Sequence, residues 1–348
     1  MSNIYAFYNR NAGFESTLES GLEVEDMEIQ DFEEFHEEMV KESALDMARI
    51  NGGMYVAEQL IENALFTAED GEVATLIEGA VKDFFEKLKE SLQKLWNKIK
   101  AWIKHIVEAV KRFFVSGKEL VKKHKAKIEK AAKDHSTKEV KCFKWAPDAL
   151  VNKTLDMLNK LESDKVASDV YDNILAKKDV DTAEAKKDIL NTVGAAKVGE
   201  IAKELKDVAR GGEKDTYTIG ELNIGEFITV VGSSDKLIKA IETTNKLIDK
   251  SMRDGISMIN TMSKDAYKDE KDTEVVGIIK KGASAYTELV RYGATLRTSV
   301  VKAYTSEVKA MSRQMTGVLK SLLNYAGSPA REKVKEGAFA DIYDALGY

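Results

Sequence analysis

The stretch from Gly79 to Lys133 constrains the fold more than any other part of the chain, because its apolar residues recur every three or four positions. Lysines occupy the opposite side of this pattern, and no Gly or Pro interrupts it between Ala80 and Ser116. The spacing predicts one long cationic amphipathic helix, about 50 Å long if unbroken. Its apolar stripe consists of Val81, Phe85, Leu88, Leu92, Leu95, Ile99, Trp102, Ile106, Val110 and Phe113.

The charge of the chain reverses at the start of this helix. Residues 1–78 contain nineteen Asp or Glu and three basic residues, which gives a net charge of −16. Residues 79–348 contain 50 basic and 40 acidic residues, which gives a net charge of +10. Such asymmetry indicates that the acidic segment is a removable or interacting tail.

Basic residues dominate the helix from Lys94 to Lys127, where the acidic residues are Glu108 and Glu119. Three interpretations are open for this region. The lysines face solvent around a core helix, they contact nucleic-acid phosphates without sequence preference, or the helix lies at a membrane interface. The residues that would make a nucleic-acid or membrane contact are Lys94, Lys98, Lys100, Lys104, Lys111, Arg112, Lys118, Lys122, Lys123, Lys125 and Lys127.

Enzyme motifs do not occur in this sequence. None of the four histidines lies in HExxH, and GxxxxGK, GxSxG and GxGxxG are absent. We therefore expect a non-enzymatic protein with no cofactor and no metal. The single cysteine, Cys142, excludes an intramolecular disulfide, and beside Phe143 and Trp145 it is expected to be a buried structural thiol. No eighteen apolar residues run together, so no transmembrane helix is expected.

The rest of the chain is also typical of helices, with one exception. Residues 216–231 are rich in β-branched residues and contain Gly220 and Gly225, which is compatible with a small β-hairpin. The expected fold is mainly α, an elongated helical bundle with long amphipathic helices. Apolar spacing predicts helices at 148–163, 165–177, 181–209, 235–264 and 273–325. The expected organisation is an acidic N-terminal pro-segment or tail (1–78), the cationic amphipathic helix (79–133) and a helical bundle domain (134–348).

The sequence Leu76-Ile77-Glu78-Gly79 lies where the charge reverses. With an acidic segment before it and a basic helical part after it, the chain resembles the internal head proteins of large myovirus-type tailed phages. The resemblance implies that a prohead protease removes the acidic pro-segment, cutting after Glu in a Leu/Ile-x-Glu sequence and often before a small residue. Leu76, Ile77, Glu78 and Gly79 match, with the cut between Glu78 and Gly79. The same triplet also ends at Glu62, Glu90, Glu108, Glu221 and Glu226.

Glu78 combines the match with a small following residue and with the charge reversal, whereas Glu108, which also precedes a small residue, Ala109, lies away from the reversal. The alternative interpretation is a Leu-Ile-Glu turn just before a helix. Removal of residues 1–78 would change the net charge from −6 to +10, which suits association with polyanionic DNA.

The resemblance implies a virion structural protein of the head interior, present in the host cytoplasm during assembly. The implied partners are the prohead protease and the capsid shell or other virion proteins. Non-specific DNA and a second copy of the chain are further candidate partners, and a membrane is a weaker one. Two other classes stay open, namely a membrane-active or pore-forming protein that uses helix 81–114 and a helical scaffold or interaction protein.

Overall fold

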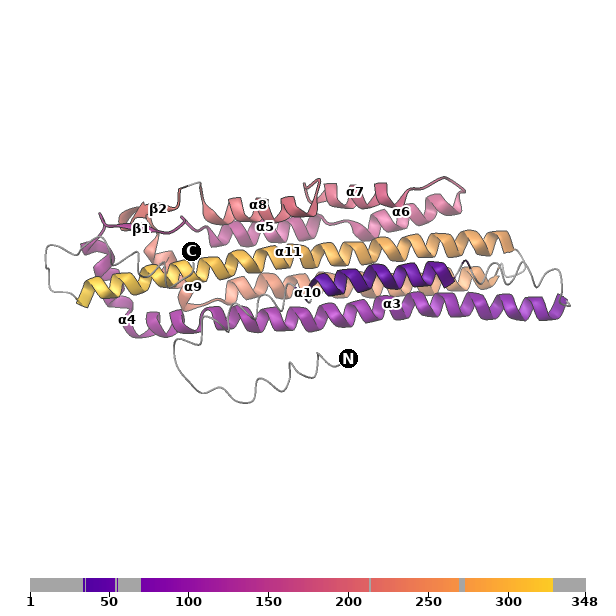
Figure 1. Ribbon diagram of the computed structural model, residues 1–348, viewed down its shortest axis with the longest axis horizontal. Coiled ribbons are helices and arrows are strands. Elements are labelled where there is room, and N and C mark those ends of the chain that lie inside the picture. The colour runs from indigo at the N-terminus through magenta and orange to yellow at the C-terminus, as the bar shows by residue number, and fades with distance from the viewer. Residues whose placement is uncertain are drawn as a thin grey trace, which may run out of the picture. The chain divides into compact units, whose positions relative to one another are not determined.

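A computed structural model describes residues 34, 36–53, 55, 70–212, 214–268 and 273–327, and these residues are mainly α-helical (Figure 1). A small two-stranded antiparallel sheet accompanies the helices, so the expected mainly α fold is confirmed. The first described helix covers residues 36–53. It is followed by α3 (Asp70–Phe113), α4 (Val115–Asp134), β1 (Glu139–Lys141), α5 (Pro147–Lys160), α6 (Ser163–Leu175), α7 (Thr182–Thr192), α8 (Val198–Arg210), β2 (Thr216–Thr218), the 3₁₀ turn η2 (Ile219–Glu221), α9 (Ile224–Gly232), α10 (Asp235–Lys268) and α11 (Thr273–Gly327).

The chain divides into two compact units. Unit 1 comprises Met1–Ala109, Glu162–Ile189 and Ile248–Thr298, and unit 2 comprises Val110–Leu161, Leu190–Leu247 and Ser299–Tyr348. Helices α3, α10 and α11 each contribute residues to both units. The units therefore cut across the segments 79–133 and 134–348, and the independence of those segments stays a prediction.

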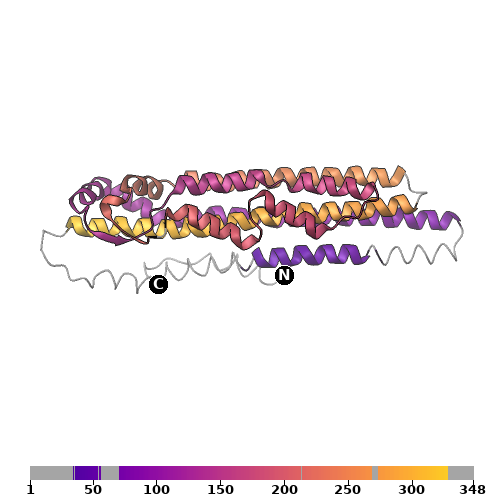
Figure 2. The ribbon, with the colours of Figure 1, turned by 90° about the horizontal axis from the view of Figure 1, so that it is seen from above.

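The core of unit 1 is built around the apolar stripe of α3. Phe85, Leu88 and Leu92 are at most 1% exposed. A Cβ atom added to Gly255 of α10 would lie 3.4 Å from Leu92 and 3.3 Å from Val290 of α11. The three long helices thus pack closely at this point, where a side chain larger than hydrogen has little room. Helix 36–53 lies beside α11 in this unit (Figure 2).

The core of unit 2 includes α4, α9 and the last part of α11. Phe227 and Val231 of α9 are buried, as are Ile128 of α4 and Tyr304 of α11. A Cβ atom added to Gly117 of α4 would overlap Val231. Glycine at this position therefore lets α4 approach α9 closely.

The small sheet differs from the expected hairpin at 216–231. Residues 216–218 form a strand, but its partner is β1, and Val140 pairs with Tyr217. Residues 224–232 form helix α9, because Asn223 caps it by accepting a hydrogen bond from the Glu226 N–H at 3.1 Å. The glycines at 220 and 225 thus belong to η2 and to the first turn of α9.

Two predicted helices are interrupted. The helix expected at 181–209 is divided into α7 and α8 by residues 193–197, where Gly194 has a φ of 78°. The Glu200 carboxylate accepts a hydrogen bond from the Ala196 N–H at 2.7 Å just before α8. The cationic helix is divided at Phe114, between α3 and α4. The second of the two helices, α8, ends close to the predicted position 209, where Gly211 caps it in the left-handed conformation with a φ of 62°.

Candidate cationic interface

The apolar stripe of α3 is packed in the interior of the protein. All ten residues of the stripe are at most 7% exposed, and Trp102 is 1% exposed. Trp96 is half-buried, and its Nε1 donates a hydrogen bond to Asp249 Oδ1 at 2.6 Å. In this conformation neither indole is presented for stacking on a nucleic-acid base, and the stripe is covered. Among the described helices, none is long and apolar enough to cross a membrane.

In unit 1, carboxylates neutralise several lysines of α3. Lys98 forms an ion pair with Glu42 of helix 36–53. Lys100 lies 3.3 Å from Asp249 of α10 and its ammonium sits 3.9 Å above the Trp96 ring. Lys94 and Lys104 are exposed and form no ion pair among the described residues. The predicted contact residues of this unit are therefore partly committed to internal pairs.

In unit 2, the predicted contact residues lie at the end of α3 and along α4, and all of them are exposed. Two of them form long ion pairs inside α4, Lys123–Glu119 at 3.9 Å and Lys125–Glu129 at 4.0 Å. Such exposed pairs contribute little. The residues concerned are Lys111, Arg112, Lys118, Lys122, Lys123, Lys125 and Lys127.

The geometry of α4 explains why these cations point outward. Gly117, Val121, Ile128 and Ala131 form its buried face, and α4 packs through this face against α9. The lysines occupy the remaining positions of the helix, with Lys118, Lys122 and Lys125 spaced by four and three residues and therefore on one side. We name the seven exposed basic residues of unit 2 the α4 cationic face. Among its members, Lys111, Lys118, Lys122 and Lys127 form no ion pair with another described residue.

The predicted cleavage site lies within α3. Residues 76–79 are helical, and Glu78 and Gly79 are exposed. A Cβ atom added to Gly79 would have no neighbour within 4 Å, so the backbone there lies in open space. The helix begins at Asp70, which places the site in its first three turns. Helical ends fray readily, and cleavage at Glu78 needs such local unwinding.

Helix 36–53 is packed into unit 1. Met39, Met47 and Ile50 are between 2% and 9% exposed and belong to the core. The buried guanidinium of Arg291, 3% exposed in its side chain, joins this helix to α11. Its Nε and Nη2 donate hydrogen bonds to Ser43 Oγ at 3.1 Å and to the Ser43 carbonyl at 2.9 Å.

Arg291 has two further partners. Its Nη1 donates a hydrogen bond to Ser91 Oγ of α3, and its guanidinium lies 3.9 Å from the Asp46 carboxylate. Burial lowers the pKa of Arg291 to about 10, and the nearby Asp46 carboxylate partly opposes this shift. Arg291 therefore remains a cation at neutral pH, and its oxygen neighbours compensate for the lost hydration.

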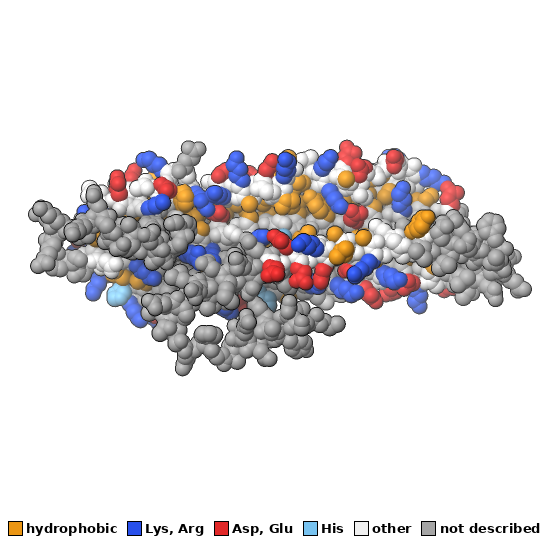
Figure 3. Space-filling model, in the orientation of Figure 1, with side chains coloured by type: hydrophobic (Ala, Val, Ile, Leu, Met, Phe, Trp, Pro, Cys, Tyr) orange, Lys and Arg blue, Asp and Glu red, His pale blue; other side chains and the backbone are white. Residues whose placement is uncertain are grey.

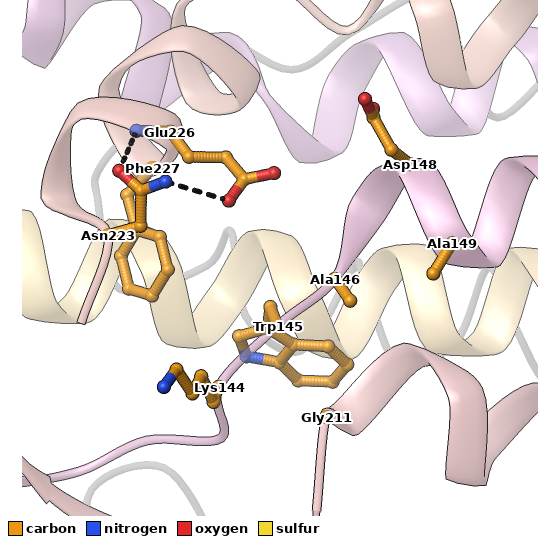
Figure 4. Close-up of a pocket in the computed structure, with 9 residues that line it drawn as sticks. All are labelled: Lys144, Trp145, Ala146, Asp148, Ala149, Gly211, Asn223, Glu226 and Phe227. Atoms are coloured by element: carbon orange, nitrogen blue, oxygen red, sulfur yellow. Dashed lines mark hydrogen bonds between the residues drawn. The ribbon is translucent and has the colours of Figure 1, made fainter. Parts of the chain in front are cut away.

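Unit 2 contains a pocket of about 460 Å³ between the starts of α5 and α9 (Figure 4). Glu226 and Asn223 lie on one side, where Asn223 Nδ2 donates a hydrogen bond to Glu226 Oε2 at 3.3 Å. Asp148 lies on another side and pairs with Lys236 at 2.5 Å. Burial raises the pKa of Glu226, and the Asp148 charge adds to this effect. The lining also contains Lys144, Trp145, Ala146, Ala149, Gly211 and Phe227.

The described residues provide no site for a metal ion and no reactive thiol. No group of three or more His, Cys, Asp or Glu side chains that could hold a metal ion is present among them. Cys142 is buried, as expected, and its burial raises the thiol pKa to about 12, so it is not a thiolate nucleophile at neutral pH. No protein-family model, no curated protein and no solved structure matches the chain.

Proposed function

We propose that this protein is a non-enzymatic structural protein of a phage virion. In this proposal it lies in the head interior, is matured by a prohead protease that cuts after Glu78, and contacts packaged DNA or the capsid shell. The observation that supports the DNA contact is the α4 cationic face, whose seven basic side chains are exposed while the opposite side of α4 is packed. Such a surface suits phosphates of any sequence.

The proposal also accounts for the charge reversal at Glu78. Residues 1–78 carry a net charge of −16, and their field opposes the approach of DNA to the same chain. Glu78 and Gly79 are exposed, as a cleavage site requires. Because helix 36–53 is held by Arg291 and by buried apolar side chains, cleavage alone would leave it bound until it dissociates.

Binding of the full-length protein to a short DNA duplex tests the DNA contact. We expect the logarithm of the affinity to fall linearly with the logarithm of the salt concentration, with a slope of about −0.9 for each phosphate contacted. Because residues 1–78 oppose DNA binding in this proposal, the form cleaved after Glu78 is measured in parallel and should bind more tightly at low salt. Binding that does not change with salt, or no binding of the cleaved form at low salt, would contradict the proposal. Leakage of anionic liposomes that persists in high salt would favour the membrane-active class instead.

Intact mass and N-terminal peptide mapping of the protein from its natural source test the maturation. A species that begins at Gly79 supports cleavage after Glu78. A chain that retains residues 1–78 in the mature particle would argue against processing. In that case the packing of helix 36–53 favours the second candidate function, a helical interaction protein in which this segment is a permanent part of unit 1.

A further inference from the structure

Helix 36–53 is seated in a groove of unit 1 whose lining is unusually polar for a helix contact. The groove is formed by Ser91 and Lys98 of α3 and by Ser284, Arg291 and Thr298 of α11. We name these five residues the hydroxyl groove. Four of them are at most 6% exposed, and Lys98 lies at the rim.

Each polar contact of the groove has a matching residue on the helix. His36 Nε2 and Thr298 Oγ1 are hydrogen-bonded at 3.0 Å, and Ser284 Oγ donates a hydrogen bond to Asn51 Oδ1 at 2.5 Å. The Ser43–Arg291 contacts lie between them. The contacts therefore recur about every two helical turns, and they run in opposite directions along the two helices. This pattern sets both the register and the orientation of the seated helix.

Groove residues also have hydrogen-bond partners outside helix 36–53. Thr298 Oγ1 donates to the Thr295 carbonyl at 2.7 Å within α11. Arg291 Nη1 retains Ser91 Oγ. Water can satisfy the remaining donors and acceptors, so an empty groove costs less than an empty apolar groove of equal area. The polar lining thus permits the helix to leave and return.

The seated face of the helix also suits reversible docking. Its buried apolar residues are Met39, Met47 and Ile50, and methionine adapts to irregular surfaces. Glu42 and Asp46 of the helix lie opposite the cations Lys98 and Arg291. The groove therefore selects a helix by apolar contact, by charge and by hydrogen bonds at fixed spacing.

We propose that the hydroxyl groove is a docking site for helix 36–53 of a second copy of the chain, so that copies exchange this helix. A second copy carries the same His36, Ser43 and Asn51 and makes the same contacts in trans. Exchange of an identical element between protomers needs no new interface, and only the effective concentration distinguishes the two arrangements.

The test joins two full-length variants by a disulfide across the groove. One chain carries Asn51→Cys and the other carries Ser284→Cys, and the native Cys142 is fully buried. After mixing under oxidising conditions, a mixed dimer forms only when the helix of one chain enters the groove of the other. A matched control replaces Ser284→Cys by Ser306→Cys, an exposed position of the same helix. We expect a mixed-dimer yield about tenfold above the control, rising with protein concentration.

A single-chain double variant, Asn51→Cys/Ser284→Cys, completes the test. It should form the bond within one chain, because the short Asn51 and Ser284 side chains are in hydrogen-bond contact. If this internal bond forms while the mixed dimer does not exceed the control, the groove accepts only its own helix and the proposal is overturned. If the internal bond does not form, the helix is not seated in the groove, which overturns the proposal as well.

Discussion

The basic residues of α3 in unit 1 and those of the α4 cationic face in unit 2 are used differently. In unit 1, Lys98 and Lys100 pair with carboxylates of other helices, and Arg291 is buried among oxygen atoms. In unit 2, the lysines of the α4 cationic face have within the described residues only two ion pairs, both close to 4 Å long and both inside α4. Basic side chains thus stabilise the packing of helices in unit 1, whereas those of the α4 cationic face remain available to a partner.

This difference shows that a run of lysines in a sequence does not define a binding surface. Lys87 and Lys122 are both exposed and both lie on long amphipathic helices. Lys87 has Asp83 one turn earlier at 2.6 Å, whereas Lys122 has no ion pair among the described residues. Charges of both signs are interspersed over the face of the molecule shown in Figure 3, outside its grey atoms. Pairing therefore decides which cations can attract a polyanion.

The largest effect is expected from removing three unpaired cations of unit 2. The triple change Lys118→Gln/Lys122→Gln/Lys127→Gln should make the salt slope of DNA binding shallower by about 2.7, which is 0.9 for each lost phosphate contact. Affinity at low salt should fall in proportion. Fluorescence anisotropy with a labelled duplex over a salt series measures both quantities.

A charge-matched triple change in unit 1 provides the control. Lys87, Lys89 and Lys100 are paired with carboxylates, so changing all three to Gln alters the net charge equally without removing free cations. We expect a clearly smaller change in slope. Equal slopes for the two triple variants would show that only net charge matters, and the comparison between the units would then fail.

The second effect concerns the buried cation of unit 1. Arg291→Ala leaves the Ser43 carbonyl and the Ser91 hydroxyl without their donor and creates a cavity, so we expect a loss of about 3 kcal/mol in the free energy of unfolding. Urea unfolding followed by circular dichroism measures this loss. Lys122→Ala removes an exposed cation of unit 2 and should change stability by less than about 0.5 kcal/mol. A similar loss for both would remove the structural role assigned to Arg291.

Much of the fold could be predicted because the apolar periodicity is strong. The stripe of α3 and the helices α10 and α11 lie close to their expected positions, since helical spacing over many turns has few alternative interpretations. The partner of β2 could not be predicted, because β1 lies about 75 residues earlier and local sequence contains no signal for such pairing. For residues 224–232 the sequence predicts a hairpin and not a helix, because β-branched residues favour strands. The Asn223 N-cap is a weaker local signal than this composition.

The contact of helix 36–53 with α11 could not be predicted for a different reason. A hydrophobic pattern counts Ser, Thr and Arg as exposed, yet α11 buries several of them. Thr287 and Thr305 donate hydrogen bonds to carbonyls four residues earlier at 2.7 and 2.8 Å, so their hydroxyl groups are satisfied inside the helix. The available signal was the two-turn spacing of Ser284, Arg291 and Thr298, which is readable only when hydroxyl groups are allowed in a core.

A third, smaller effect tests how the α4 cationic face is held in place. Gly117→Ala would place a Cβ atom into Val231 and 2.8 Å from Thr316 Oγ1, so we expect a loss of about 2 kcal/mol in stability and weaker DNA binding without any change of charge. Gly277→Ala in unit 1 has no atom within 4 Å and lies in a helix, so it should stabilise by up to about 1 kcal/mol. Unchanged stability of the Gly117 variant would mean that α4 can shift away from α9 at little cost.

The smallest effect is expected at the pocket of unit 2. Burial and the Asp148 charge raise the pKa of Glu226, while Lys236 and the Asn223 hydrogen bond partly oppose this shift. The folded state therefore binds a proton at Glu226 more tightly than the unfolded state, and stability falls as the pH rises from about 4.5 through the folded pKa.

Glu226→Gln keeps the acceptor for Asn223 and removes this titration. We expect the variant to match the wild type at pH 4 and to exceed it by less than about 0.5 kcal/mol at pH 7, as measured by urea unfolding at both pH values. A variant that is less stable than the wild type at pH 7 would show instead that the Glu226 charge is favourable there, through Lys236 or through the start of α9.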